Sequence, residues 1–198
     1  RKFKKTVQMI SYAPHFISTV VICAMLKLFC SRSAGIFNNI IDMLGGVRQD
    51  MLSNPKLFPH LYVWSGVWQE LGWGAIIYLA ALAAVDPELH EAATIDGASR
   101  IQRIRYINIP TIVPTIIILL IMRMGSLVSV GYEKVYLLQN DLNVEVSEVI
   151  STYVYKRGLL QNNYSFSTAV GLFNNVVNIA LLLLTNFITR RVSDTSLF

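Results

Sequence analysis

Residues 86–110, DPELHEAATIDGASRIQRIRYINIP, form a polar, helix-capable stretch between two strongly apolar segments of the chain. Asp86 is a favourable N-cap, and Pro87 fits the first position of a helix. The sequence therefore predicts a short helix over residues 87–95. Ordered structure in the loop of a strongly apolar chain indicates a segment that docks onto something at the membrane surface.

The predicted helix is expected to end at Asp96 and Gly97. Gly97 can adopt a left-handed conformation, and Asp96 can cap whatever follows. A second helix, with Ile101 and Ile104 on one face, is expected to lie at the lipid headgroups and to lead to Pro110. Small side chains around the turn allow a neighbouring backbone or groove to approach closely: Ala92, Ala93 and Ala98.

The composition of the whole chain is that of a membrane protein. Of its 198 residues, 54% are hydrophobic and 15% are charged, against about 25% charged in ordinary globular domains. The mean hydropathy is +0.49, and several apolar runs approach the roughly 20 residues that span a bilayer. We therefore expect an all-α polytopic bundle with four spans, at residues 7–29, 61–85, 107–130 and 168–188.

Two segments between the spans are expected to be helical without crossing the membrane. Apolar residues recur at helical spacing over 36–44, which predicts a short surface helix closed by Gly45 and Gly46. Residues 132–167 are too polar to span, and one amphipathic helix is expected near 146–160. Cys23 and Cys30 lie in one apolar run and are interpreted as packing residues rather than as a disulfide or a metal site.

Basic residues predict the orientation, because loops rich in Lys and Arg stay in the cytoplasm. With four spans, one side holds nine of them: Arg1, Lys2, Lys4, Lys5, Arg100, Arg103, Arg105, Arg190 and Arg191. The other side holds six: Arg32, Arg48, Lys56, Lys134, Lys156 and Arg157. Residues 1–5, the loop 86–106 and the C-terminus are therefore expected in the cytoplasm. The net charge of +5 is explained by topology and lipid attraction, and no nucleic-acid partner is expected.

The loop also carries a recognisable signature. Glu91-Ala92-Ala93-x-x-Asp96-Gly97-Ala98, followed by Ile107-x-Ile109-Pro110, resembles the EAA signature of binding-protein-dependent ABC importer permeases. The usual form has Phe where this chain has Ile104 and Leu where it has Ile109. The stretches SYAPHFIS, GWGAIIYLAAL and YSFSTAVGLF resemble the sugar-permease branch (the MalF/MalG-like class), particularly the LplB-type polysaccharide permeases.

The resemblance implies the core of a type I ABC importer permease with six spans, of which this chain holds the last four. Residues 1–198 would then be a single, N-terminally incomplete transmembrane domain in the plasma membrane. The loop 86–110 would be the coupling element that inserts into a cytoplasmic ATPase subunit. The residues implied in this coupling are Glu91, Ala92, Ala93, Asp96, Gly97, Ala98, Ile104 and Pro110. The implied partners are two ATPase subunits, a second permease that is identical or different, an extracellular solute-binding protein and membrane lipid.

Several polar or aromatic side chains inside the expected spans are candidates for the translocation path. Glu70 and Arg123 are costly near mid-membrane, about 2.5–3.5 kcal/mol for a central Arg or Asp. They could pair with each other or line the path, and packing within the bundle is the favoured role for Arg123. Trp68 and Trp73 are deep enough to face a sugar-binding cavity. Two asparagines of the last span could bind a sugar hydroxyl, although hydrogen bonding between helices is the commoner role of such residues: Asn174 and Asn178.

No enzymatic motif accompanies these features. The chain lacks a GxxxxGK[ST] phosphate loop, so ATP hydrolysis is expected from a partner subunit and no cofactor is expected here. The resemblance therefore predicts the permease of a carbohydrate importer, and the expected solute is an oligosaccharide. The alternatives are an ABC permease for an amino acid, peptide or ion, a secondary transporter or channel without an ATPase, and a regulatory anchor without transport.

Overall fold

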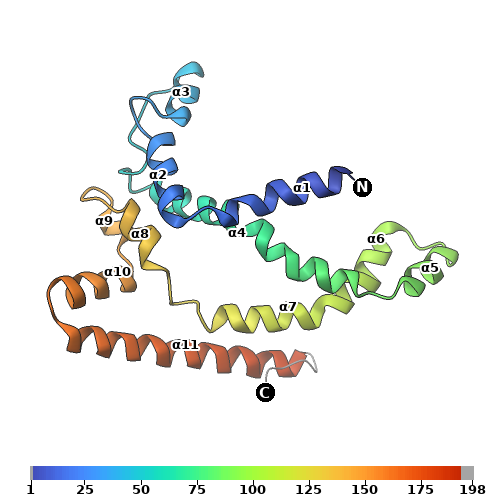
Figure 1. The fold of residues 1–198 in the computed structure, drawn as a ribbon. Helices are drawn as coiled ribbons and strands as arrows, with labels where there is room; N and C mark the ends of the chain where they lie inside the picture. The colour runs from blue at the N-terminus through green and yellow to red at the C-terminus, as the bar shows by residue number, and fades with distance from the viewer. Residues whose placement is uncertain (1, 193–198) are drawn as a thin grey trace. The chain divides into compact units, whose positions relative to one another are not determined.

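The computed structural model describes residues 2–192, and these residues form helices joined by turns and loops (Figure 1). They group into two compact units. The first unit comprises the residues up to Trp73 together with Val130–Gly171, and the second comprises Gly74–Ser129 and the residues from Leu172 onward. Residues 1 and 193–198, which belong to the segments expected in the cytoplasm, lie outside the described residues.

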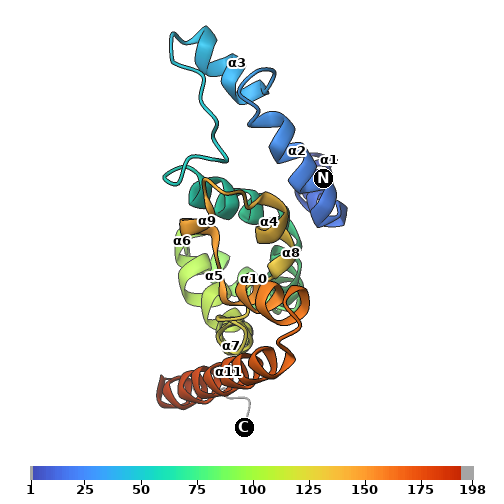
Figure 2. The same ribbon diagram turned by 90° about the vertical axis from the view of Figure 1, so that its left-hand side faces the viewer.

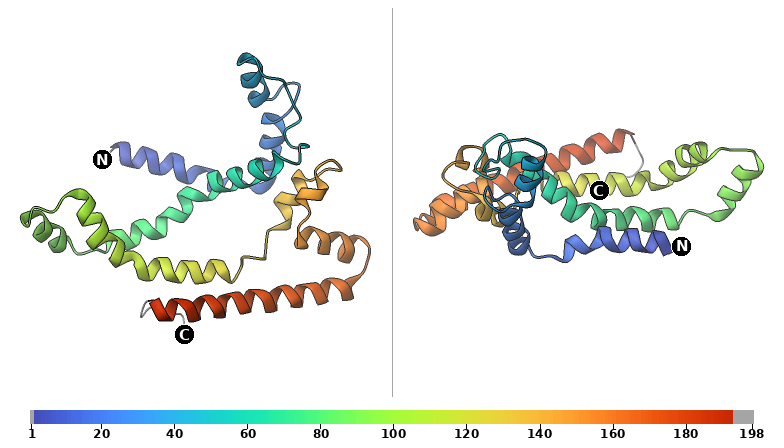
Figure 3. Two further views of the ribbon diagram at one scale, coloured as in Figure 1. Left: turned by 180° about the vertical axis from the view of Figure 1, so that it is seen from behind. Right: turned by 90° about the horizontal axis from the view of Figure 1, so that it is seen from above.

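The first expected span, 7–29, is broken. Helix α1 (Lys2–Tyr12) runs into a 3-10 turn, η1 (Ala13–Phe16), and helix α2 (Thr19–Phe29) continues at 99° to the first part (Figure 3). Pro14 has no N–H to continue the α-helical ladder, and Ser18 caps α2 by accepting a hydrogen bond from the Val21 N–H. The prediction of one continuous helix here was wrong.

The short surface helix was predicted correctly. Helix α3 (Ile36–Met43) is closed by Gly45, whose φ of +80° lets the Gly46 N–H bond to the Ile41 carbonyl at 2.8 Å. Asn38 is completely buried and donates through Nδ2 to the carbonyls of Ser31 and Gln49, each at 3.0 Å. This side chain therefore fixes the loops on both sides of α3.

Helix α4 (Phe58–Ala83) is 26 residues long and corresponds to the expected span 61–85. The amphipathic helix expected over 146–160 is split instead. Helices α9 (Val144–Ser147) and α10 (Ile150–Val154) are separated by extended backbone at Glu148 and Val149, and η3 (Tyr155–Leu160) adds a π-helical turn. The prediction of a single helix was therefore wrong in its continuity.

A small core holds the first unit together. Helix α8 (Tyr132–Leu138) packs against α2, and buried Asn143 donates to the Leu52 carbonyl at 2.9 Å and the Leu138 carbonyl at 3.1 Å. The buried hydrophobic side chains of this core are Cys23, Cys30, Met51, Leu52, Phe58 and Leu138. Both cysteines are free thiols buried among these side chains, in agreement with their expected packing role.

The second unit contains the third span. Helices α5 (Pro87–Ile95) and α6 (Arg100–Arg103) precede a π-helical turn, η2 (Ile104–Asn108), and helix α7 (Ile109–Met124). The π turn lies just before Pro110, which cannot donate the backbone hydrogen bond that a regular ladder needs. The Ile109 N–H bonds to the Ile104 carbonyl five residues back. The helix ends at Met124, six residues before the expected boundary at 130.

Helix α11 (Tyr164–Val192) corresponds to the last expected span, 168–188. Within the second unit, α7 and the C-terminal part of α11 lie side by side (Figures 1 and 2). A side chain at Gly125 would meet Leu182 Cδ1 at 2.8 Å, which shows how closely the chain approaches α11 where α7 ends.

The described helices allow up to four membrane crossings. Two helical stretches, Arg100–Met124 and Tyr164–Arg191, are long and apolar enough to span a membrane by themselves. Two bent pairs pass the same test together: α1–η1 with α2, and α4 with α5, the latter bent by 68°. The upper count of four equals the number expected from the sequence.

Candidate functional site

The helix–turn–helix of residues 86–104 is built from local hydrogen bonds. Asp86 Oδ1 accepts from the Glu88 N–H at 2.9 Å, so Asp86 caps α5 as predicted. Gly97 has φ +77°, the left-handed conformation that the sequence predicted. This turn lets the Ala98 N–H bond to the Ala93 carbonyl at 2.8 Å and closes α5.

The cap of the second helix differs from the prediction. Ser99, not Asp96, caps α6: Ser99 Oγ accepts from the Gln102 N–H at 3.4 Å, and Gln102 Oε1 accepts from the Ser99 N–H at 2.7 Å. This reciprocal pair is a capping box. Its spacing, Ser-x-x-Gln, is visible in the sequence and was missed.

A side-chain bridge joins the two helices of the loop. Arg103 Nη1 donates to Thr94 Oγ1 at 3.1 Å, and Thr94 Oγ1 donates to the His90 carbonyl at 2.6 Å. Because the bridge connects α6 with the last turns of α5, it restrains the angle between them. Sequence reasoning assigned Arg103 only a topological role, and nothing local in the sequence indicated this contact.

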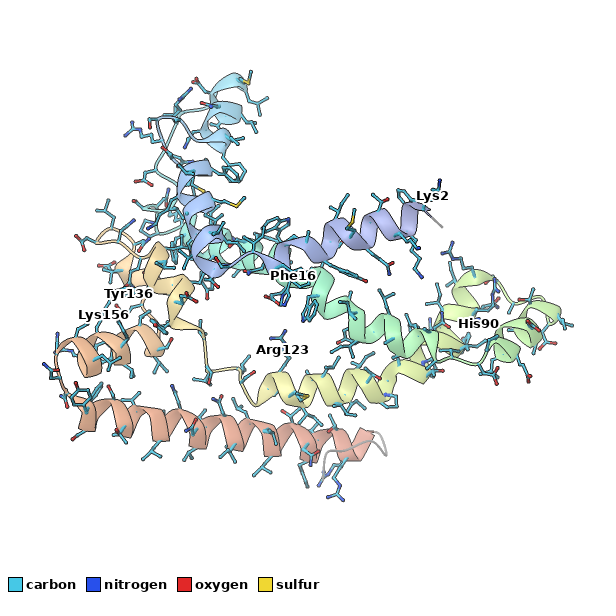
Figure 4. The ribbon with its side chains drawn as sticks, viewed as in Figure 1. Lys2, Phe16, His90, Arg123, Tyr136 and Lys156 are labelled. Carbon is cyan, nitrogen blue, oxygen red and sulfur yellow. The ribbon has the colours of Figure 1, made fainter. Side chains whose placement is uncertain are left out.

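The predicted coupling residues present an accessible surface. Within it, Glu91, Ala92, Asp96 and Gly97 are exposed, whereas Ala93 and Ala98 are half-buried in the turn. Large apolar side chains are also exposed here, with Ile95 at 86%, Ile101 at 76% and Ile104 at 42%. His90 marks α5 in Figure 4. Exposed apolar side chains beside acidic ones are typical of a surface that contacts another protein or lipid.

A second cluster surrounds the break in the first span. His15 Nδ1 lies 3.2 Å from Glu70 Oε2, and the imidazole stacks on Trp73 with ring centroids 4.3 Å apart and 4° between the planes. Phe16, labelled in Figure 4, meets both rings edge-on at 5.7 Å. Gln69 Nε2 donates to the Ile17 carbonyl at 3.2 Å.

The sequence had singled out only part of this cluster. Glu70 and Trp73 were candidates, whereas His15 was not. The pairing joins positions 55 residues apart, so no local pattern could have revealed it.

Trp68 lies apart from this cluster, in an apolar pocket of about 450 Å³ within the first unit. Residues of α2, α3 and α4 line the pocket, including Ile22, Phe37 and Leu61. Trp68 is 50% exposed. The exposed part of the Trp68 ring can therefore contact a further apolar group.

Three candidates lie in the second unit. Asn178 is buried, accepts from the Val128 N–H at 3.3 Å and donates to Ser129 Oγ at 2.8 Å. Asn174 Oδ1 is buried without a hydrogen-bond partner among residues 2–192. Arg123 is exposed, and its side chain points away from α11 (Figure 4).

The polar segment after α7 carries a further network, which sequence reasoning did not identify. Lys156 Nζ donates to Glu148 Oε2 at 2.7 Å and to Gln139 Oε1 at 2.5 Å, joining η3 to α8 (Figure 4). Burial raises the pKa of the Glu148 carboxyl, but hydrogen bonds from Lys156, Thr152 and Gln139 outweigh it and hold this pKa below its ordinary value. The network stabilises the fold of this segment.

The chain is similar to known transport proteins over nearly all its length. Residues 1–194 match the family described as "Binding-protein-dependent transport system inner membrane component". The chain is 42% identical over 196 residues to protein LplB of Bacillus subtilis (strain 168), covering 99% of this chain and 62% of that protein. It is 41% identical over 196 residues to the polygalacturonan/rhamnogalacturonan transport system permease protein YteP of the same organism, covering 99% of this chain and 61% of that protein.

A solved structure shares the fold. A chain in the crystal structure of a bacterial alginate ABC transporter, in complex with alginate pentasaccharide-bound periplasmic protein, superposes with a TM-score of 0.95 at 41% identity. The match covers 99% of this chain and 68% of that chain. This chain spans about three fifths of the length of the curated relatives it matches. With a family match over nearly all its residues, the chain belongs to the family of binding-protein-dependent transport system inner membrane components.

Proposed function

We propose that the protein is a permease subunit of an ATP-driven ABC importer that carries a carbohydrate, an oligosaccharide derived from a polysaccharide. The observation that carries this proposal is the preformed α5–α6 hairpin, whose exposed signature residues fit a docking element. The identity to LplB and YteP and the fold shared with a chain of the alginate transporter support the carbohydrate class.

The proposed role of the hairpin is mechanical coupling. Glu91, Ala92, Asp96 and Gly97 are exposed on the hairpin and would contact a groove of the ATPase subunit. Ala93 and Ala98 would keep the turn compact, while Ile104 and Pro110 would join the hairpin to α7. Closure of two ATPase subunits around ATP would move α5 and switch the pathway from inward-facing to outward-facing.

The proposed assembly follows from this role. It contains two ATPase subunits, a second permease that is identical or different, and an extracellular solute-binding protein, all held at the plasma membrane. ATP hydrolysis is assigned to the ATPase subunits. Residues 1–5, the loop 86–106 and the C-terminus are proposed to lie in the cytoplasm, because the basic residues are concentrated in these segments.

The proposed pathway residues divide into two groups. Asn174 offers a buried oxygen without a partner among the described residues, Arg123 is exposed and Trp68 is half-exposed, so these three are proposed to meet solute. The others already contact protein groups and are proposed to shape the pathway instead: Glu70, Trp73 and Asn178.

The coupling role is tested by co-purification of the ATP-binding subunit with the full-length permease. Glu91→Lys and Gly97→Trp should abolish co-purification and ATP-dependent uptake. Glu88→Lys, on the same helix but outside the signature, should retain both. Gly45→Trp is the matched control for Gly97, because Gly45 has a similar φ of +80° and belongs to the first unit, outside the hairpin. Undiminished, ATP-independent uptake in the Glu91 and Gly97 variants would exclude an ABC importer.

The cargo is tested by uptake in membrane vesicles that contain the complete transporter and its binding protein. We expect uptake of alginate or galacturonate oligosaccharides and no uptake of amino acids or dipeptides. Asn174→Ala should raise the KM for the transported sugar with little change in ATPase assembly. Uptake of an amino acid or peptide alone would overturn the carbohydrate assignment and leave the importer class intact.

A further inference from the structure

We propose that Gln69, Glu70 and Trp73 of α4 are positioning residues that lock the break in the first span. The bend of 99° between α1 and α2 is thereby kept constant while the transporter changes conformation. This inference rests on the proposed importer function, and it concerns residues whose contacts are all inside the first unit.

The backbone at the break needs an outside partner. Pro14 removes one N–H, and Ile17 adopts an extended conformation (φ −82°, ψ 128°) between η1 and α2. A carbonyl in extended backbone inside a membrane has no water to bind, so it must be satisfied by protein. The Gln69 side chain of α4 supplies the donor, at 3.2 Å from the Ile17 oxygen.

The side chains of the break are held as well. His15 is placed between two residues of α4, with Glu70 Oε2 at 3.2 Å from its Nδ1 and Trp73 stacked on its ring. Phe16 adds edge-on contacts to His15 and Trp73. The stacked indole of Trp73 restrains the imidazole, and His15 Nδ1, which makes no hydrogen bond among residues 2–192, lies within ion-pair distance of the Glu70 carboxylate.

The two helices also touch through their backbones. Gly72 is buried against the Ser11 carbonyl, and a Cβ at this position would come within 2.9 Å of Ser11 Cβ and still closer to the Ser11 carbonyl group. Residues 69–73 of α4 therefore contact the chain before, within and after the break, at Ser11, His15 and Ile17.

This arrangement suits a lock rather than a hinge. A hinge absorbs changes of φ and ψ at a few residues, whereas α4 contacts this break at Ser11, His15 and Ile17. Helix α4 continues to Ala83, and the coupling hairpin begins at Pro87. Movement of this helix would therefore carry both halves of the first span together, without a change at the bend.

The test measures the distance between α1 and α2 in the full-length permease, assembled with its ATPase subunits in lipid nanodiscs. Spin labels are placed at Met9 and Leu28, which are 68% and 69% exposed, after replacement of Cys23 and Cys30 by alanine. In the wild-type lock, one narrow distance distribution is expected, unchanged between the nucleotide-free and the ATP–vanadate states. A shift of this distance between the two states would overturn the proposal.

Variants of α4 test whether its side chains keep the distance between α1 and α2 constant. Gln69→Ala and Glu70→Ala should each broaden the distribution and lower the maximal uptake rate at least threefold, with KM nearly unchanged. Glu70→Gln keeps the size of the side chain and a polar oxygen beside His15 and should restore the narrow distribution, and Leu71→Ala, an exposed neighbour, should have no effect. If both alanine variants keep the narrow distribution, the proposal is wrong. If either fails to assemble, the wild-type comparison of nucleotide states still decides.

The two proposals can fail separately. Loss of the importer function would appear as absence of the ATPase subunit from the purified wild-type complex. The label distances can still be read from the permease in nanodiscs, so a failed lock appears as a broad distribution in a complex that transports normally.

Discussion

Gly72 illustrates how one residue sets the approach of two helices. It is buried in α4 against the Ser11 carbonyl of α1, whereas Gly74, two positions later, would meet no atom of the described residues within 4 Å of an added Cβ. The two glycines share a helix and a sequence neighbourhood. Only the first is required by packing, and no local pattern distinguishes them.

This contrast gives the first prediction. Gly72→Ala should push α4 away from Ser11 and destabilise the permease by about 1–3 kcal/mol, the usual cost of overpacking. Gly74→Ala should be neutral. The measurement is the Tm of the purified permease in detergent, followed by size-exclusion chromatography after heating. Equal Tm values for the two variants would show that α1 and α4 do not approach each other as described.

A second residue-scale prediction concerns Glu148, whose pKa is held below the ordinary value of 4.5. A carboxyl with a lowered folded-state pKa stabilises the fold above its ordinary pKa, and this contribution is lost as the pH falls through the folded value. The Tm should therefore decrease from about pH 4.5 downward. Glu148→Gln should lower the Tm at pH 7 and flatten this acid slope, and an unchanged slope would contradict the role of the Lys156 pair.

At the scale of elements, the features that were predicted correctly are those that depend on neighbouring residues in the sequence. The cap at Asp86, the turn at Gly97 and the bounds of α5 depend on residues within one or two turns of each other, and the structure agrees with all three. The cap of α6 is equally local, but the sequence analysis expected Asp96 as the cap and overlooked the Ser99–Gln102 pair. That error came from interpretation, because the information was present in the sequence.

The α6 cap leads to an element-scale prediction. Ser99→Ala removes one side of the capping box, which costs about 0.5–2 kcal/mol. The loss should appear as faster hydrogen–deuterium exchange over residues 99–104, with no change in α11. Gln102→Ala should show a smaller effect, because Ser99 still accepts a hydrogen bond from the residue-102 N–H. Unchanged exchange in the Ser99 variant would mean that other contacts hold α6.

The broken first span could not be predicted in the same way. Pro14 was visible in the sequence, but prolines are tolerated in membrane helices when neighbouring groups satisfy the freed carbonyls. The groups that contact this break, on Gln69, Glu70 and Trp73, lie more than 50 residues away in the sequence. The same reason explains why Glu70 was a candidate without a partner and His15 was no candidate at all: their pairing exists only in the folded chain.

At the scale of the whole molecule, the orientation connects the separate elements to the proposed function. In the proposed function the α5–α6 hairpin reaches a cytoplasmic ATPase, and with four crossings the segments around α3 and α8–η3 would then face outward. This arrangement requires the bent pair α1–α2 to cross the membrane once, in spite of its 99° bend. The basic residues alone support it, because nine lie on the proposed inner side and six on the outer side.

Single cysteines at exposed positions test this orientation with a membrane-impermeant maleimide. Val47→Cys and Leu142→Cys, 82% and 70% exposed in the wild type, should react in intact cells. Lys5→Cys and Ile95→Cys should react only after permeabilisation. The native thiols should stay silent at pH 7, since Cys23 and Cys30 are buried and burial, with a smaller contribution from Asp50, raises the pKa of Cys30 to about 11. Labelling of position 5 in intact cells, with position 95 still protected, would mean that α1 and α2 do not form a crossing and that the N-terminal segment lies outside.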